Sequence, residues 1–242
     1  MCQAMPVRCV GWVTPERFIE YTNNLTIDLT NSKFSFYVEA DVDYPQELHD
    51  LHNDYPFLPE KMVIPDSLLS PAQLRNRVGK PCSIEKLVSN LLNKRNYVCH
   101  YRNLKQAVEN GLTIRKIHRV FMIEQSFWMA DYIKFNNDMR TKATTDFEKD
   151  FFKLMNNSVF GKTMENIFNR VDIEIVNSQK RCSKLVASER FVRIITISKN
   201  IVMVQKHKSN LVLNKPIFVG ATVLETSKWL MYDFHYNFVK KI

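Results

Sequence analysis

Glycine is scarce in this chain of 242 residues, with only 5, and the hydrophobic fraction is 45%. That composition excludes a collagen-like chain and a largely disordered one. No apolar run reaches the roughly 18 to 20 residues that span a bilayer, and the N-terminus lacks a basic segment followed by an apolar one. We therefore expect a folded chain with no membrane partner.

Cysteine is also sparse, since the five residues are odd in number, scattered, and never spaced as a CxxC pair. This pattern indicates free thiols in a reducing, intracellular compartment. Neither Cys99 with His100 nor His49 with His52 has further ligands at the close spacing typical of zinc sites. The sequence therefore predicts no protein metal site.

Positive charge is concentrated toward the C-terminus. Residues 1–133 hold 15 Lys and Arg and 15 Asp and Glu, whereas residues 134–242 hold 19 and 10. All of the net charge of +9 therefore lies in the second segment, as expected for a polyanion partner there. A basic but inert surface would give the same count, and charge alone leaves both interpretations open.

The hydrophobic pattern predicts a mixed α/β (α+β) chain. Alternation predicts strands, and the strand, helix, strand order in the middle of the chain implies a mixed sheet. Residues 1–30 lack a pattern, and the prolines of 46–82 predict a looped segment with one short helix near 70–77. The expected strands are 34–45, 97–102 and 112–125, and the expected helices are 103–110, 128–140, 145–162 and 217–240.

The segment 145–162 carries polar chemistry on one side of its predicted helix. Thr145 and Glu148 form a capping-box pair, and Gly161 stands where a helix would end. One face offers a cation, amides and a ring, which suit a phosphate and a sugar or base, although solvated lysines on an ordinary amphipathic helix look the same. At about 100° per residue, that face holds Lys149, Lys153, Asn156, Asn157 and Phe160. The apolar face, expected to be buried, holds Phe147, Phe151, Phe152, Leu154, Met155 and Val159.

The window KLMNNSVFG, residues 153–161, resembles the Kx3NSxYG signature called motif B on the fingers helix of family B DNA polymerases. Phe160 replaces the usual Tyr and keeps the ring. In that family the lysine contacts the phosphates of the incoming nucleotide, the asparagine and ring lie near its sugar and the nascent base pair, and the glycine lets the template approach. The resemblance assigns these roles to Lys153, Asn157, Phe160 and Gly161.

Further contacts with the substrates are expected from neighbouring residues. Arg140 or Lys142, on or just after the preceding helix, would supply a second cation for the nucleotide phosphates, although no fixed spacing supports this. Ser158 and Lys162 are expected to contact DNA. Lys228 would lie near the primer-template backbone, where relatives carry a basic residue, although a lysine at a helix edge is an alternative interpretation.

Most of the chain, about residues 37–241, is similar to the protein-primed DNA polymerases of Maverick or Polinton transposons and related viral or organellar enzymes. That resemblance implies a partial palm sheet with a helical fingers hairpin. Residues 1–126 would be partial palm with the insertion region between motifs A and B, 127–170 the fingers hairpin, and 171–242 the return to the palm. The matching stretches are 41–62, 96–128, 147–176 and 213–241.

The family's chemistry requires two Mg²⁺ ions held by aspartates of motifs A and C. Relatives place motif A just before a segment like residues 1–6 and motif C shortly after one like 233–236, and no DTD sequence occurs here. Asp41 and Asp43 precede Tyr-Pro as in motif A, but their neighbours match a later segment, so we do not expect them to bind metal. No catalytic residue is assigned.

The resemblance therefore implies a DNA-directed DNA polymerase, a nucleotidyltransferase, represented by a fragment that is inactive alone. Its expected partners are primer-template DNA, deoxynucleoside triphosphates and, at the insertion region, a terminal priming protein. Two alternatives remain open. The chain could be a remnant that binds nucleic acid or nucleotides without catalysis, or a decayed transposon fragment without function.

Overall fold

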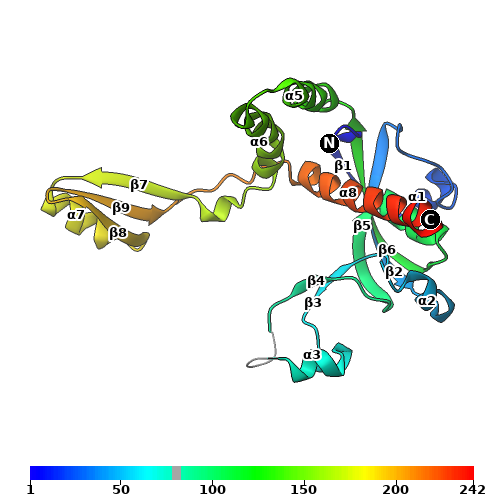
Figure 1. The fold of residues 1–242 in the computed structure, drawn as a ribbon. Coiled ribbons are helices and arrows are strands. Elements are labelled where there is room, and N and C mark those ends of the chain that lie inside the picture. Colours follow the sequence, from blue (N-terminus) through cyan, green and yellow to red (C-terminus); the bar gives the residue numbers. More distant parts are fainter. Residues whose placement is uncertain (78–82) are drawn as a thin grey trace. The chain divides into compact units, whose positions relative to one another are not determined.

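The computed structural model describes residues 1–77 and 83–242, which form helices and antiparallel sheets (Figure 1). The predicted combination of helices and strands is confirmed. The chain divides into unit 1, Met1–Asn156 with Ala221–Ile242, and unit 2, Asn157–Gly220. The resemblance led us to expect different boundaries, with segments 1–126, 127–170 and 171–242. The polymerase roles of those three segments stay predictions.

The elements of unit 1 up to residue 126 are β1 (Met5–Val13), α1 (Pro15–Tyr21), β2 (Phe34–Asp43), η1 (Gln46–Leu48), α2 (His49–His52), β3 (Glu60–Met62), η2 (Asp66–Leu68), α3 (Pro71–Arg75), β4 (Lys86–Val88), β5 (Lys94–His100), α4 (Tyr101–Glu109) and β6 (Thr113–Ser126). The later elements of the chain are α5 (Ala130–Lys142), α6 (Asp146–Thr163), η3 (Ile167–Asn169), β7 (Val171–Val176), α7 (Gln179–Val186), β8 (Phe191–Ser198), β9 (Ile201–His207), α8 (Ile217–Asn237) and η4 (Val239–Lys241). Helices α6 and α8 each run across a unit boundary.

The main sheet of unit 1 has the strand order β1-β6-β2-β5, and all of its ladders among the described residues are antiparallel. The predicted mixed sheet is therefore wrong. Helix α4 does connect β5 to β6 as expected, but β2 lies between these two strands, so they never pair directly. The prediction failed because strand order depends on long-range pairing, which the local pattern does not encode.

The expectation of irregular structure at residues 1–30 is also wrong. Strand β1 pairs along β6, with Met5 opposite Ser126, and the Thr14 hydroxyl caps α1. Strand β1 lies at the edge of the sheet, and its apolar residues Val7 and Trp12 are exposed. Its sequence therefore lacks the regular alternation of apolar and polar residues from which a strand is predicted.

The core of unit 1 lies where α1 and α4 meet β2. Phe18, Phe36 and Tyr101 are fully or almost fully buried, and their rings meet edge to face with centroids 5.2 to 6.5 Å apart. The Tyr101 hydroxyl donates to the carbonyl of Ile27 at 2.6 Å. This bond satisfies the buried phenol and fixes the loop between α1 and β2.

Helix α8 is tied to α4 and β5 by one carboxylate. Glu225 accepts hydrogen bonds from the backbone N–H of His100 at 3.0 Å and from Asn103 Nδ2 at 2.6 Å. One turn further on, Gln106 Nε2 donates to the carbonyl of Trp229 at 3.2 Å. These polar bonds set the register of α8 along α4, because buried amide groups must find partners.

Aromatic rings hold the later part of α8 against the segment that follows α2. The rings of Tyr232 and Tyr236 stack on Phe57 with centroids 4.8 and 4.5 Å apart. Their hydroxyls donate to the carbonyls of Pro56 and Tyr55 at 2.7 and 2.8 Å. This cluster buries apolar area and leaves each phenol hydrogen-bonded.

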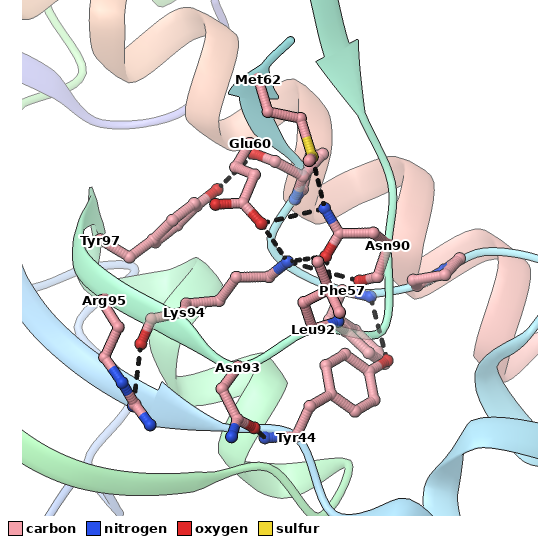
Figure 2. A network of polar contacts seen from close by, with 12 residues as sticks. Tyr44, Phe57, Glu60, Met62, Asn90, Leu92, Asn93, Lys94, Arg95 and Tyr97 are labelled. Carbon is pink, nitrogen blue, oxygen red and sulfur yellow. Dashed lines mark hydrogen bonds and ion pairs between the residues drawn. The ribbon is translucent and has the colours of Figure 1, made fainter. Parts of the chain in front are cut away.

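A fully buried lysine joins the two-stranded sheet of β3 and β4 to the main sheet. Lys94 Nζ at the start of β5 forms an ion pair with Glu60 Oε1 at 2.8 Å and donates to the Asn90 side chain, as Figure 2 shows. Asn90 Nδ2 in turn donates to Glu60 Oε1 at 2.9 Å. Burial lowers the pKa of Lys94, and the Glu60 carboxylate opposes that shift.

We predict that Glu60→Leu lowers the free energy of unfolding by about 3 kcal/mol, because it leaves a buried ammonium without its carboxylate. The double variant Glu60→Leu, Lys94→Met should recover most of that loss, since it removes both charges and keeps the volume. Urea unfolding of both variants measures this. A wild-type midpoint for Glu60→Leu alone would contradict the role of the pair.

His100 is buried and begins α4. Its Nδ1 accepts the N–H of Arg102 at 3.4 Å as an N-cap, and its Nε2 lies 3.1 Å from Ser35 Oγ. Burial lowers the pKa of His100 to about 4 from 6.5. The folded chain thus holds this imidazole neutral.

The stability conferred by neutral His100 should be fully present above about pH 6.5 and fall as the pH drops toward about 4, because only the unfolded chain takes up the proton in that range. The loss amounts to about 3 kcal/mol at about 1.4 kcal/mol per pKa unit. His100→Asn keeps a capping side chain and does not titrate, so its unfolding free energy should depend less steeply on pH. Equal slopes for wild type and variant would contradict the prediction.

Unit 2 is a small α/β unit, with strand order β7-β9-β8 and α7 along one face (Figure 1, yellow). Val176, Leu185 and Val204 are buried between helix and sheet. In the same unit, Gly220 lies so close to Met164 that a Cβ there would stand 2.2 Å from the Met164 sulfur.

None of the described helices is long and apolar enough to cross a bilayer.

Candidate functional site

Two helices joined by a three-residue connection form the hairpin that the sequence predicts. Helix α5 ends at Lys142 and α6 begins at Asp146. The capping box is present, because Glu148 N–H donates to the Thr145 hydroxyl and Thr145 N–H donates to the Glu148 carboxylate, both at 3.2 Å. The start of α6 could be predicted from the sequence because the two capping residues are only three positions apart.

An amide cluster holds the two helices together. Asn136 Nδ2 of α5 donates to Asn156 Oδ1 at 2.9 Å, and Asn156 Nδ2 donates to Asn137 Oδ1 at 3.0 Å. Asn156 is therefore half-buried at the helix contact, and its predicted place on the exposed face is wrong. Asn136 is itself buried, and its amide finds the partner that it needs on the facing helix.

The predicted buried stripe of α6 is correspondingly wrong in part. Phe147, Phe151 and Leu154 are exposed, at 79%, 46% and 62%, whereas Phe152, Met155 and Val159 are half-buried. The contact with α5 passes through the face that contains Asn156, so the helix is turned away from the orientation that its apolar residues alone favour. Periodicity identifies the helix but does not identify the face that meets a partner.

Lys153 and Asn157 lie one turn apart on α6, and both are exposed. No residue in the described parts of the chain forms a hydrogen bond or ion pair with either side chain. Phe160 follows on the same side and is half-buried. A free ammonium and a free amide on one helix face can bind a phosphate and a sugar or base edge.

Arg140 is an exposed cation in the last turn of α5, followed by exposed Lys142. Among the described residues neither forms an ion pair. Both side chains are therefore available to an anionic ligand, as the sequence interpretation requires.

Gly161 does not end the helix as predicted, because α6 continues to Thr163. The residue is exposed, and a Cβ built on it meets nothing within 4 Å. The helix ends instead near the Thr163 hydroxyl, which bonds back to the carbonyl of Phe160 at 2.7 Å. Nothing in the fold therefore requires glycine at position 161.

Two of the predicted DNA-binding lysines already have carboxylate partners. Lys162 lies 2.8 Å from Glu165, which also pairs with Arg170 and Lys215 at 2.7 and 2.9 Å. The hydrogen bond from Arg170, followed by those from the two lysines, holds the pKa of Glu165 far below its usual range. This cluster retains an excess of positive charge.

Lys228 lies 2.6 Å from Glu225 Oε1 and is half-buried. It belongs to the polar contacts that tie α8 to α4. Ser158 is exposed on α6. The structure thus brings Lys153, Asn157 and Ser158 onto one helix, but it gives Lys228 a structural partner of its own.

The carboxylates that resemble motif A are engaged in cross-strand pairs. Asp41 Oδ1 accepts the N–H of Asn96 at 2.8 Å and lies 3.0 Å from His118 Nε2, and Asp43 pairs with Arg95 at 2.9 Å. The hydrogen bond from Asn96, followed by that from His118, lowers the pKa of Asp41. Each of these two carboxylates therefore has its Oδ1 atom engaged with a neighbouring strand.

Nowhere in residues 1–77 or 83–242 do three or more His, Cys, Asp or Glu side chains gather as a metal site.

The sequence interpretation missed unit 2 as a structural unit. Its 64 residues hold 11 Lys and Arg against 4 Asp and Glu, a net charge of +7 out of +9. Three segments rich in β-branched apolar residues, 171–176, 191–198 and 201–207, were the available signal, with Lys199-Asn200 as the turn. Most of the excess positive charge thus belongs to one folded unit.

Comparisons with protein-family models, with curated proteins and with solved structures find no match to this chain.

We predict that Gly161→Ala raises stability by roughly 0.5 to 1 kcal/mol, because alanine favours the helix and the site is open. Gly220→Ala is the matched control in α8, where the added Cβ would crowd Met164 and should lower stability. Thermal unfolding of both variants measures this. Destabilisation by Gly161→Ala would show that the helix backbone at 161 is constrained.

Proposed function

We propose that this chain is a fragment of a family B DNA polymerase that binds nucleotide and primer-template DNA through α6 and does not extend a primer by itself. The observation that carries the proposal is that the motif B-like residues lie on the second helix of a helical hairpin, with Lys153 and Asn157 exposed and unpaired among the described residues. Side chains without an internal partner keep their hydrogen-bonding groups available for a nucleotide.

Each residue of that face has a physical task in the proposal. Lys153 contacts the phosphates, because its long stem carries a compact charge that can follow them. Asn157 offers an amide donor and acceptor to the sugar or the nascent base pair. Phe160 supplies a ring for stacking, and Gly161 leaves the helix surface low enough for the template strand. Arg140 adds a second cation from α5.

Unit 2 supports the DNA-binding part of the proposal through its net charge of +7. Such charge density attracts a polyanion and makes the affinity depend on salt, because bound counterions are released from the DNA. The insertion region within residues 1–126 is the proposed contact for a terminal priming protein. In a complete enzyme two Mg²⁺ ions would be held by aspartates outside the residues described here.

A second candidate function, that of a remnant that binds nucleic acid or nucleotides without catalysis, is favoured by the same charge in unit 2. The two differ in what α6 does. A remnant that binds through unit 2 alone would be insensitive to changes at Lys153. A decayed fragment would bind neither DNA nor nucleotide.

We predict that Lys153→Ala weakens binding of a primer-template and deoxynucleotide roughly tenfold, since a hydrogen bond to a charged group contributes about 1.5 kcal/mol. The slope of log affinity against log salt should fall by about one phosphate contact. Lys33→Ala is the control, because it removes an exposed lysine of unit 1 whose partner is Glu124. Fluorescence anisotropy across a salt series measures all three proteins.

Primer extension with magnesium and all four nucleotides, run on the same preparations, should give no product. Extension would overturn the proposed division between binding and catalysis, and Asp41→Asn and Asp43→Asn would then identify the carboxylates responsible. Equal binding by wild type and Lys153→Ala would exclude α6 as the nucleotide-binding element.

A further inference from the structure

A cavity of about 480 Å³ lies in unit 1, away from the residues assigned to nucleotide and DNA binding. Arg102 and Lys105 of α4, Trp229 of α8, and Asp28 and Thr30 of the loop before β2 line it. The volume falls within the roughly 300 to 1,000 Å³ typical of small-molecule sites.

The walls of this cavity are fixed by hydrogen bonds outside it. His100 caps the start of α4, and Gln106 bonds the backbone of Trp229 at 3.2 Å. The hydroxyl of Tyr101 holds the loop through Ile27 at 2.6 Å. The polar groups that line the cavity are thus already placed, so little ordering is needed when a ligand binds.

Arg102 is the cation at the centre of the site. Its guanidinium lies over the Trp229 ring, 4.2 Å from the centroid, and Nη1 donates to Gln3 Oε1 at 3.3 Å. No carboxylate in the described residues lies within ion-pair distance of it. A half-buried guanidinium that retains N–H donors and forms no close ion pair with the described residues can bind a phosphate through its planar fork.

The lining of the cavity also contains a carboxylate, that of Asp28. Both the N–H and the hydroxyl of Thr30 donate to Asp28 Oδ1, at 2.9 and 2.6 Å, and the hydroxyl bond is the main reason that the pKa of Asp28 is lowered. Oδ2 of this ionised carboxylate accepts no hydrogen bond from the described residues. Lys105 and Glu109 also line the cavity, but they form an ion pair with each other on the same helix, so Asp28 and Arg102 set the selectivity of the cavity.

We propose that this cavity binds a sugar phosphate, with the phosphate on Arg102 and the sugar hydroxyls on Asp28. A bare anion would be repelled by Asp28, whereas hydroxyl groups donate to a carboxylate as ribose does in nucleotide-binding proteins. The site shares no residue with α6, and it does not depend on the proposed polymerase function.

Calorimetric titration of the full chain with ribose 5-phosphate tests the proposal, with inorganic phosphate and ribose as component probes. Ribose 5-phosphate should bind saturably and more tightly than either component. Arg102→Gln should weaken it at least roughly tenfold, and Arg102→Lys, which keeps the charge without the fork, should weaken it less. Lys153→Ala should leave this binding unchanged.

Asp28→Asn separates a sugar phosphate from a simple anion. Loss of the carboxylate should weaken the binding of ribose 5-phosphate, because the sugar hydroxyl groups lose a charged hydrogen-bond acceptor. Tighter binding by Asp28→Asn would overturn the proposal in favour of an anion site, and so would equal affinity for inorganic phosphate. Absence of saturable binding, or binding that Lys153→Ala abolishes and Arg102→Gln does not, would also overturn it.

Discussion

The carboxylate of Glu225 is the contact on which the arrangement of unit 1 depends. It joins α8 to the end of β5 and to α4 through His100 N–H and Asn103, and it neutralises Lys228 on its own helix. The cavity beside Trp229 and the position of Lys228 both follow from this attachment. Removing this half-buried acceptor leaves several donors unsatisfied together, so its effect extends over three elements.

Much of the fold was predictable because the determining signals are local. The strand 34–45, the helix 103–110 with Asn110-Gly111 behind it, and the capping box of Thr145 lie within short windows, and the structure has all three. Gly111 has φ +96°, which explains why glycine follows this helix. The strand order and β1 were not predictable, because they depend on pairing between residues that are far apart in the sequence, such as Tyr37 with His100 and Met5 with Ser126.

The candidate site was predictable in its helix and residues but not in its surroundings. Helical periodicity placed Lys153 and Asn157 together, and both are exposed. It placed Asn156 with them, because angles on a wheel do not reveal that Asn136 and Asn137 stand opposite. The amide cluster turns the exposed side of α6 to include Phe147. A polar contact between helices outweighed the apolar stripe, which no single-helix argument could anticipate.

The proposed binding activities use different parts of the chain. Helix α6 binds the nucleotide, the positive charge of unit 2 attracts DNA, and the cavity with Arg102 binds a sugar phosphate. The central claim concerns α6, and the most direct measurement is to map the crosslink formed by a photoactivatable deoxynucleoside triphosphate in the presence of primer-template DNA. The proposed function predicts crosslinked peptides from residues 153–161. Crosslinks confined to other segments, with residues 153–161 unlabelled, would contradict it.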